Sequence, residues 1–130
     1  MKSAIYSIAA AGLMLGSIGT AFAGAADYTF EPVAVDVHNV KGSEFAVRLV
    51  HKPTGKPVEK AVIFRTRLDM SPDGMADMAA AHQAVPASEP GVYRFKGDFN
   101  MAGKWAFKLM AKVPGEQETI EGTVVFNAKD

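Results

Sequence analysis

Hydrophobic and polar residues alternate along most of the chain after residue 27, with the period of a β-strand that has one buried face. The alternation is clearest over residues 45–49, 62–69 and 105–111. Turn signals separate these runs at Pro53-Thr54-Gly55-Lys56-Pro57, at Pro90-Gly91 and at Pro114-Gly115. We therefore predict an all-β fold, an antiparallel β-sandwich of about six or seven strands, with Trp105 in its core.

The run over residues 62–69 predicts a strand with two different faces. The apolar face would carry Val62, Phe64, Thr66 and Leu68. The opposite face would carry Ile63, Arg65, Arg67 and Asp69. We expect Arg65, Arg67 and Asp69 to form a solvated face, and a patch that docks a partner is the second interpretation.

The strand alternation stops between Asp69 and Pro90. Loops longer than about 12–15 residues are uncommon in compact domains and are often functional. Here Ser71 suits a helix N-cap, Pro72 suits the first helical position, and the alanines that follow favour a helix. We predict one long Met-rich loop or a short helix over residues 71–84. On a helix, Met75, Met78 and His82 would share one stripe at spacings i, i+3 and i+7.

The first residues have the pattern of an export leader. Met1-Lys2 is positive, residues 4–18 are apolar and small, and Thr20-Ala21-Phe22-Ala23 ends in an A-x-A cleavage pattern. We predict a signal peptide over residues 1–23 and a single domain over residues 24–130. A transmembrane anchor is the alternative, but glycines interrupt an apolar run that is already short for spanning a bilayer. The leader predicts a periplasmic protein without a stable membrane anchor.

The composition excludes several classes of protein. The 14 basic and 14 acidic residues balance, which argues against a nucleic-acid binder and against a polybasic membrane-surface protein. The chain has no cysteine, so disulfides, thiolate metal sites and cysteine nucleophiles are excluded. The sequence contains no G-x-S-x-G elbow, no H-E-x-x-H motif and no phosphate-binding glycine loop. We therefore do not expect an enzyme.

Methionine and histidine remain as the soft or borderline metal ligands. Thioether sulfur is soft and uncharged, and it selects Cu(I) over harder ions. The predicted stripe of Met75, Met78 and His82, with Met70 and Met101 at neighbouring strand ends, therefore points to a copper site. The alternative is that the methionines form an apolar surface that packs on the core or on a protein partner.

Four motifs resemble a known family. They are Thr54-Gly55-Lys56-Pro57-Val58 followed by Ala61-Val62, the Met-rich stretch from Met70 to Met78, Gly91-Val92-Tyr93, and Phe99-Asn100-Met101-Ala102-Gly103-Lys104-Trp105. Together they look like a YtkA-like, or FixH-like, domain, and the resemblance covers residues 43–113. It implies a small immunoglobulin-like sandwich outside the cytoplasm that is associated with copper or heavy-metal handling. It also implies Met70, Met75, Met78 and Met101 as candidate ligands.

The leader, the methionines and the resemblance together predict a soluble periplasmic metal-binding protein. It would buffer Cu(I), or deliver it to an efflux system or to a partner in cuproprotein assembly. The alternative is a non-catalytic protein–protein interaction module, or an accessory subunit of an efflux or oxidase-assembly system. We expect no nucleic-acid partner and no cofactor other than copper.

Overall fold

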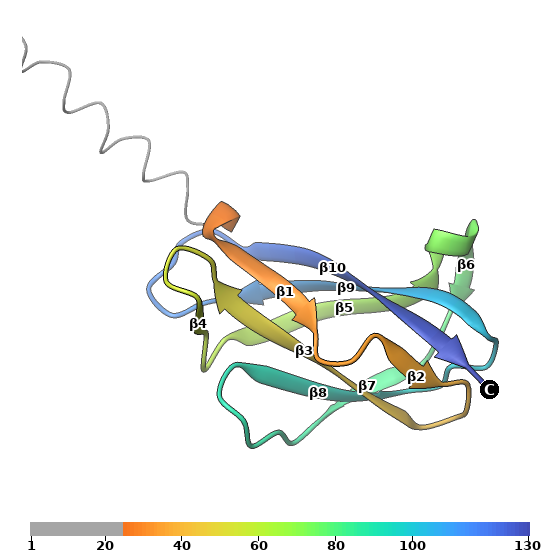
Figure 1. The fold of residues 1–130 in the computed structure, drawn as a ribbon. Helices are drawn as coiled ribbons and strands as arrows, with labels where there is room; N and C mark the ends of the chain where they lie inside the picture. The colour runs from red at the N-terminus through yellow and green to blue at the C-terminus, as the bar shows by residue number, and fades with distance from the viewer. Residues whose placement is uncertain (1–24) are drawn as a thin grey trace, which may run out of the picture.

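The computed structural model describes residues 25–130, which form two β-sheets packed face to face (Figure 1). The all-β prediction is confirmed. The signal peptide predicted over residues 1–23 lies outside the described residues. Within residues 25–130, no helix is both long enough and apolar enough to cross a membrane.

Each sheet contains five strands. The first sheet has the order β1 (Tyr28–Pro32), β3 (Ser43–His51), β8 (Val92–Gly97) and β7 (His82–Val85), and β4 (Lys56–Pro57) pairs with β3. The second sheet has the order β2 (Asp36–His38), β10 (Ile120–Lys129), β9 (Gly103–Lys112), β5 (Val62–Met70) and β6 (Met75–Ala79). Two 3₁₀ turns, η2 (Ala25–Asp27) and η3 (Ser71–Asp73), complete the described elements.

The strand count and the pairing differ from the prediction in two ways. The described part of the chain has ten strands, because short strands such as β2 and β4 add to the long ones that alternation reveals. The pairing is antiparallel except between β2 and β10, which run parallel. A strand of three residues such as β2 offers too few positions for a period of two to be recognised.

The core between the sheets is aromatic. Trp105, Phe107 and Phe126 of the second sheet are fully buried. The ring of Phe45 on β3 meets two of them edge-on, with its centroid 4.9 Å from Phe107 and 5.2 Å from Phe126. Such aromatic pairs contribute about 0.5–1.5 kcal/mol each beyond the area that they bury. The prediction that Trp105 lies in the core is confirmed, and its indole Nε1–H donates to the carbonyl of Met101 at 3.0 Å.

A bulge in β5 changes which of its residues face the core. The pairing with β9 steps from Ile63 to Arg65 and leaves out Phe64. Val62 and Phe64 are consequently 62% and 52% exposed, whereas Ile63 packs against the core. The prediction that Val62 and Phe64 share the buried face with Leu68 is wrong, because the extra residue shifts the alternation by one position.

The Met-rich segment is largely extended instead of helical. Ser71–Asp73 form the single 3₁₀ turn η3, which ends at Gly74 in the left-handed region with φ of 76°. The chain then forms β6 and β7, which belong to different sheets. Of the two interpretations of residues 71–84, a long loop or a short helix, the helix is therefore wrong, and so is the stripe of side chains that it would have presented.

The physical reason is a competition between local propensity and pairing. Pro72 does start a turn, as predicted, but Gly74 ends it after one turn. Alanine is favoured in a helix over ordinary residues by at most about 0.7 kcal/mol per residue. Pairing of β6 with the end of β5, at Asp69 and Met70, outweighs this preference.

Candidate metal-binding edge

Strand β6 carries Met75 and Met78 at the edge of the second sheet. Between Asp69 and Met70, β5 advances by one residue, while its partner position on β6 moves from Ala79 to Met75. Residues 76–78 therefore bulge out of the ladder, as is common next to functional sites. Met75 and Met78 are each 36% exposed. Both side chains are thus open to solvent on the same short strand.

A buried carboxylate holds the start of this segment. Asp69 is fully buried; its Oδ1 accepts from the backbone N–H of Ser71 at 2.9 Å, and its Oδ2 accepts from Arg67 Nε at 2.7 Å and from Lys108 Nζ at 3.2 Å. Arg67 Nη2 also donates to the carbonyl of Ala76 at 2.7 Å. These bonds tie β5, η3 and β6 together. The expectation that Asp69 is solvated is wrong, because the segment folds back over it.

The charge of Asp69 is maintained by its hydrogen bonds. Burial alone would raise the pKa of this carboxyl group. The hydrogen bonds from Ser71, Arg67 and Lys108 outweigh burial and hold the pKa well below its ordinary range. Asp69 is therefore an anion at neutral pH.

The turn η3 also rests on the start of β9. Asp73 Oδ2 accepts from the backbone N–H of Lys104 at 2.9 Å. Gly103 has φ of 138°, and a Cβ at this position would lie 2.5 Å from Asp73 Oδ2 and 2.7 Å from Met70 Cε. A side chain at position 103 would force the ends of Asp73 and Met70 to move. Met101 lies just before Gly103 in sequence, so the contact brings the loop between β8 and β9 next to η3 and β6.

Four of the five candidate ligands lie on segments that meet at one end of the second sheet, where η3 and β6 contact the start of β9. We call these four residues the methionine edge: Met70, Met75, Met78 and Met101. Met101 is 40% exposed, in the same range as Met75 and Met78. Met70 is fully buried and is the ladder partner of Met75. Figure 1 shows β6 and the turn before it at the end of the sandwich where β9 begins. Three thioether side chains are thus exposed on these segments, whereas that of Met70 is buried.

His82, the fifth candidate, lies on β7 of the first sheet. Its Nε2 is 2.7 Å from Thr66 Oγ1, and its Nδ1 is 3.0 Å from the carbonyl oxygen of Ala80. Its ring meets Phe107 edge-on at 5.5 Å. Because a carbonyl oxygen only accepts, Nδ1 carries a proton and donates to Ala80. In the tautomer that has its one proton on Nδ1, Nε2 accepts from the Thr66 hydroxyl. Both ring nitrogens are therefore engaged, and the structure gives His82 a place between the two sheets.

Oxygen and nitrogen ligands do not cluster in the described region. Among residues 25–130, no group of three or more His, Cys, Asp or Glu side chains is arranged to hold a metal ion. The methionines of this edge contribute neutral, soft sulfur, and exposed Asp77 adds a carboxylate between Met75 and Met78.

Two of the sequence motifs meet in space. Gly91 has φ of 74°, and a Cβ there would lie 2.5 Å from Pro57 Cβ. The hydroxyl of Tyr93 donates to the carbonyl of Val58 at 2.8 Å and accepts from the N–H of Ala61 at 3.0 Å. The glycine-lysine-proline turn and the Gly-x-Tyr motif therefore stabilise one corner of the sandwich.

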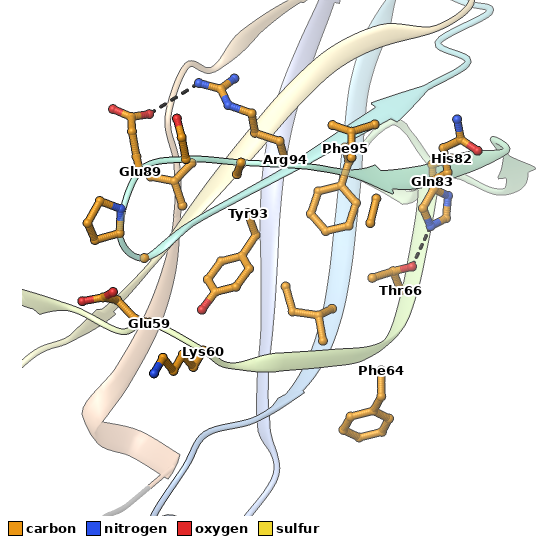
Figure 2. A pocket seen from close by; sticks show the side chains of 18 of the residues that line it. Glu59, Lys60, Phe64, Thr66, His82, Gln83, Glu89, Tyr93, Arg94 and Phe95 are labelled. Atoms are coloured by element: carbon orange, nitrogen blue, oxygen red, sulfur yellow. Dashed lines mark hydrogen bonds and ion pairs between the residues drawn. The ribbon is translucent and has the colours of Figure 1, made fainter.

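A groove that we did not predict opens beside β5, β7 and β8, with a volume of about 580 Å³ (Figure 2). Tyr93 and Phe95 reach into it from β8, and the Thr66–His82 hydrogen bond lies at one end. Over residues 62–67, the described strand pairs of β5 are with β9 alone, so its other edge is open there; at Leu68 the carbonyl already accepts from the N–H of Ala80. The sequence carries no signal for this groove, because the alternation around the exposed Phe64 is that of a buried strand.

The family model described as YtkA-like matches residues 22–110 of the chain. No curated protein shows a match. The matched region includes the whole methionine edge and the motifs that pack around it.

Proposed function

The chain belongs to the YtkA-like family, and from this premise we propose that it is a soluble periplasmic protein that binds Cu(I) through methionine thioethers. It would buffer the ion or pass it to an efflux system or a cuproprotein. The observation that supports the proposal is that Met75, Met78 and Met101 are exposed, on segments that meet through η3 and the start of β9. The proposal includes the immunoglobulin-like class and the export leader expected from the sequence.

The donor set fits this ion. Thioether sulfur prefers Cu(I) to Zn(II), Mg(II) and Ca(II). In the proposed site Met75, Met78 and Met101 are the ligands, and buried Met70 supports β6 from below. Thioethers need no deprotonation before they bind, unlike thiolate or imidazole ligands. Cu(I) affinity should therefore change little with pH between about 5 and 8.

An anaerobic Cu(I) titration against a coloured chelator tests the proposal. We expect one equivalent to bind, and we expect Met75→Leu together with Met78→Leu to weaken binding by about tenfold or more. Leucine keeps the side-chain volume at a cost usually below about 1.5 kcal/mol, so the fold should survive. Met101→Leu should weaken binding in the same direction.

Met110→Leu is the matched control. Met110 lies on β9 at the opposite end from Gly103, about 23 Å along the strand. The Met110→Leu variant should leave Cu(I) affinity unchanged. Met70→Leu should lower the stability of the fold more than it lowers Cu(I) affinity. Unchanged affinity in the double variant of Met75 and Met78 would show that these methionines are not the ligands.

The groove favours a second candidate function, that of a module that binds an extended segment of a protein partner. The free edge of β5 offers unpaired backbone groups, and an added strand would pair with them and cover Phe64. Phe64→Ser should then abolish capture of a partner from metal-free periplasmic extract, while Met75→Leu with Met78→Leu should not. Equal capture by wild type and Phe64→Ser would exclude this function for the groove.

A further inference from the structure

The outer face of the second sheet concentrates positive charge. On β9 the core residues Trp105, Phe107, Leu109 and Ala111 point inward, so Lys104, Lys108 and Lys112 point outward. On β5, Arg65 and Arg67 lie on the same outer side. We call Arg65, Arg67, Lys104, Lys108 and Lys112 the basic face. On the outer side of β5, β9 and β10, the exposed acidic residue is Glu121.

Two cations of the basic face are fixed in an arrangement that usually costs stability. Arg67 and Lys108 are direct partners in the β5–β9 ladder, and like charges in that position repel. Both contact Oδ2 of Asp69, which compensates the repulsion from beneath. Their side chains stay about half exposed, so their outer surfaces are open to a ligand. Arg65 and Lys104 form no ion pair with another residue of the described region.

The basic face is hollowed. A depression of about 460 Å³ is bordered by Arg65, Arg67, Lys108 and Glu121, with half-buried Met110 among its lining residues. The cations at positions 104, 108 and 112 follow one another at about 13 Å along β9. This spacing suits carboxylates distributed along an extended chain, and a hollow suits such a chain better than a flat bilayer.

We infer that the basic face docks an acidic segment of a protein partner. The whole chain has 14 basic and 14 acidic residues, so the positive charge is a local property of this surface. Local charge of this kind steers and orients a partner of opposite sign.

The basic face continues directly into the methionine edge. Arg67 Nη2 bonds the carbonyl of Ala76 on β6, and the backbone N–H of Lys104 bonds Asp73 of η3. An acidic partner on the basic face would therefore sit beside the exposed methionines. The docking stands on charge and shape, whereas a role for it in metal transfer rests on the proposed function.

The test measures binding of a fluorescent oligoglutamate peptide to metal-free protein, produced from the full-length sequence, at low ionic strength. The variant Arg65→Gln, Lys104→Gln, Lys112→Gln removes three charges without touching the Asp69 network. We expect it to bind at least about tenfold more weakly, and we expect added salt to weaken wild-type binding. The control Lys52→Gln, Lys56→Gln, Lys96→Gln removes the same charge from exposed sites elsewhere and should bind like wild type.

Three results would overturn the inference. One is an equal loss of binding in the two charge variants, which indicates unspecific attraction. Another is the absence of peptide binding at low salt. The third is binding to phosphatidylglycerol vesicles without binding to the peptide, which would make this a membrane-facing surface. Because Met75→Leu with Met78→Leu should leave peptide affinity unchanged, a failure of docking is distinguishable from a failure of metal binding.

Discussion

The hydroxyl of Thr66 on β5 and Nε2 of His82 on β7 lie 2.7 Å apart and connect the two sheets. Nδ1 of the same ring donates to the carbonyl of Ala80 at 3.0 Å, and in the tautomer protonated at Nδ1 alone the Thr66 hydroxyl donates to Nε2. The imidazole is therefore a structural link between the layers, close to the aromatic core at Phe107.

Thr66→Val should destabilise the fold by about 1–3 kcal/mol, because valine keeps the shape of threonine and leaves Nε2 of His82 without a donor. Urea unfolding measures the loss.

His82→Gln should leave Cu(I) affinity within about twofold of wild type. A tenfold loss in His82→Gln would return His82 to the ligand set.

Asp69→Asn should lower the free energy of unfolding by about 3–5 kcal/mol, because Arg67 and Lys108 lose the charge that holds them together. Urea unfolding at neutral pH measures the change. Asp77→Asn, which removes an exposed carboxylate from the β6 bulge, is the matched control and should stay within about 0.5 kcal/mol of wild type. Similar losses in the two variants would contradict the role given to Asp69.

The same carboxylate predicts acid sensitivity. The folded pKa of Asp69 lies below its unfolded value near 4, so its contribution to stability is complete above that value. The contribution is lost as the pH falls below about 4 toward the folded pKa. Unfolding free energy measured between about pH 6 and pH 2 should therefore decline less steeply in Asp69→Asn than in wild type. Parallel curves for the two proteins would refute this linkage.

Gly103→Ala should cost more stability than Gly115→Ala. Both glycines have positive φ, at 138° and 89°, but only at position 103 would the added Cβ meet other residues, Asp73 and Met70. We expect a difference of about 1–3 kcal/mol from this overpacking. Thermal or urea unfolding of the two variants measures it. Equal losses of stability in the two variants would show that η3 moves to accommodate the new methyl group without a loss of folding free energy.

The Tyr28 hydroxyl should lose its proton at a higher pH than an ordinary tyrosine does. Burial raises its pKa to about 12, assisted by the hydrogen bond and the charge of Glu116, whose Oε2 accepts from the Tyr28 hydroxyl at 2.8 Å. Because the folded pKa is raised, the stabilisation is complete below pH of about 10 and is lost as the pH rises through the folded value. Absorbance of tyrosinate follows the titration, and Glu116→Gln should lower the midpoint. An unchanged midpoint in Glu116→Gln would contradict the contribution of Glu116.

The long strands could be predicted from sequence because their burial follows a period of two. On β9, alternation from Trp105 to Ala111 and the buried aromatic residues agree with the structure. On β5 the same reasoning failed before Arg65, since a bulge of one residue leaves no mark in a pattern of hydrophobic and polar letters.

The candidate site could be predicted in part. Clustering of methionine singled out Met75 and Met78. The expectation that strand ends meet agrees with the contact between the start of β9, which follows Met101, and η3. The conformation of the segment could not be predicted, because tertiary pairing with β5 decided it. His82 was grouped with the methionines only through a helical spacing that the chain does not adopt. The Cu(I) ligand set stays a prediction.

The hydrogen bonds that hold the methionine edge in place each join a side chain of another residue type to a main-chain atom. These bonds use the N–H of Ser71, the carbonyl of Ala76 and the N–H of Lys104. The backbone carbonyl of Met101 likewise accepts a hydrogen bond, from the indole N–H of Trp105. None of these bonds involves a thioether, so the exposed side chains can be exchanged while the scaffold persists. Architecture and side-chain chemistry are thereby separate properties of this edge. If the edge binds Cu(I) as proposed, variation at positions 75, 78 and 101 would change its ion selectivity within one unchanged shape.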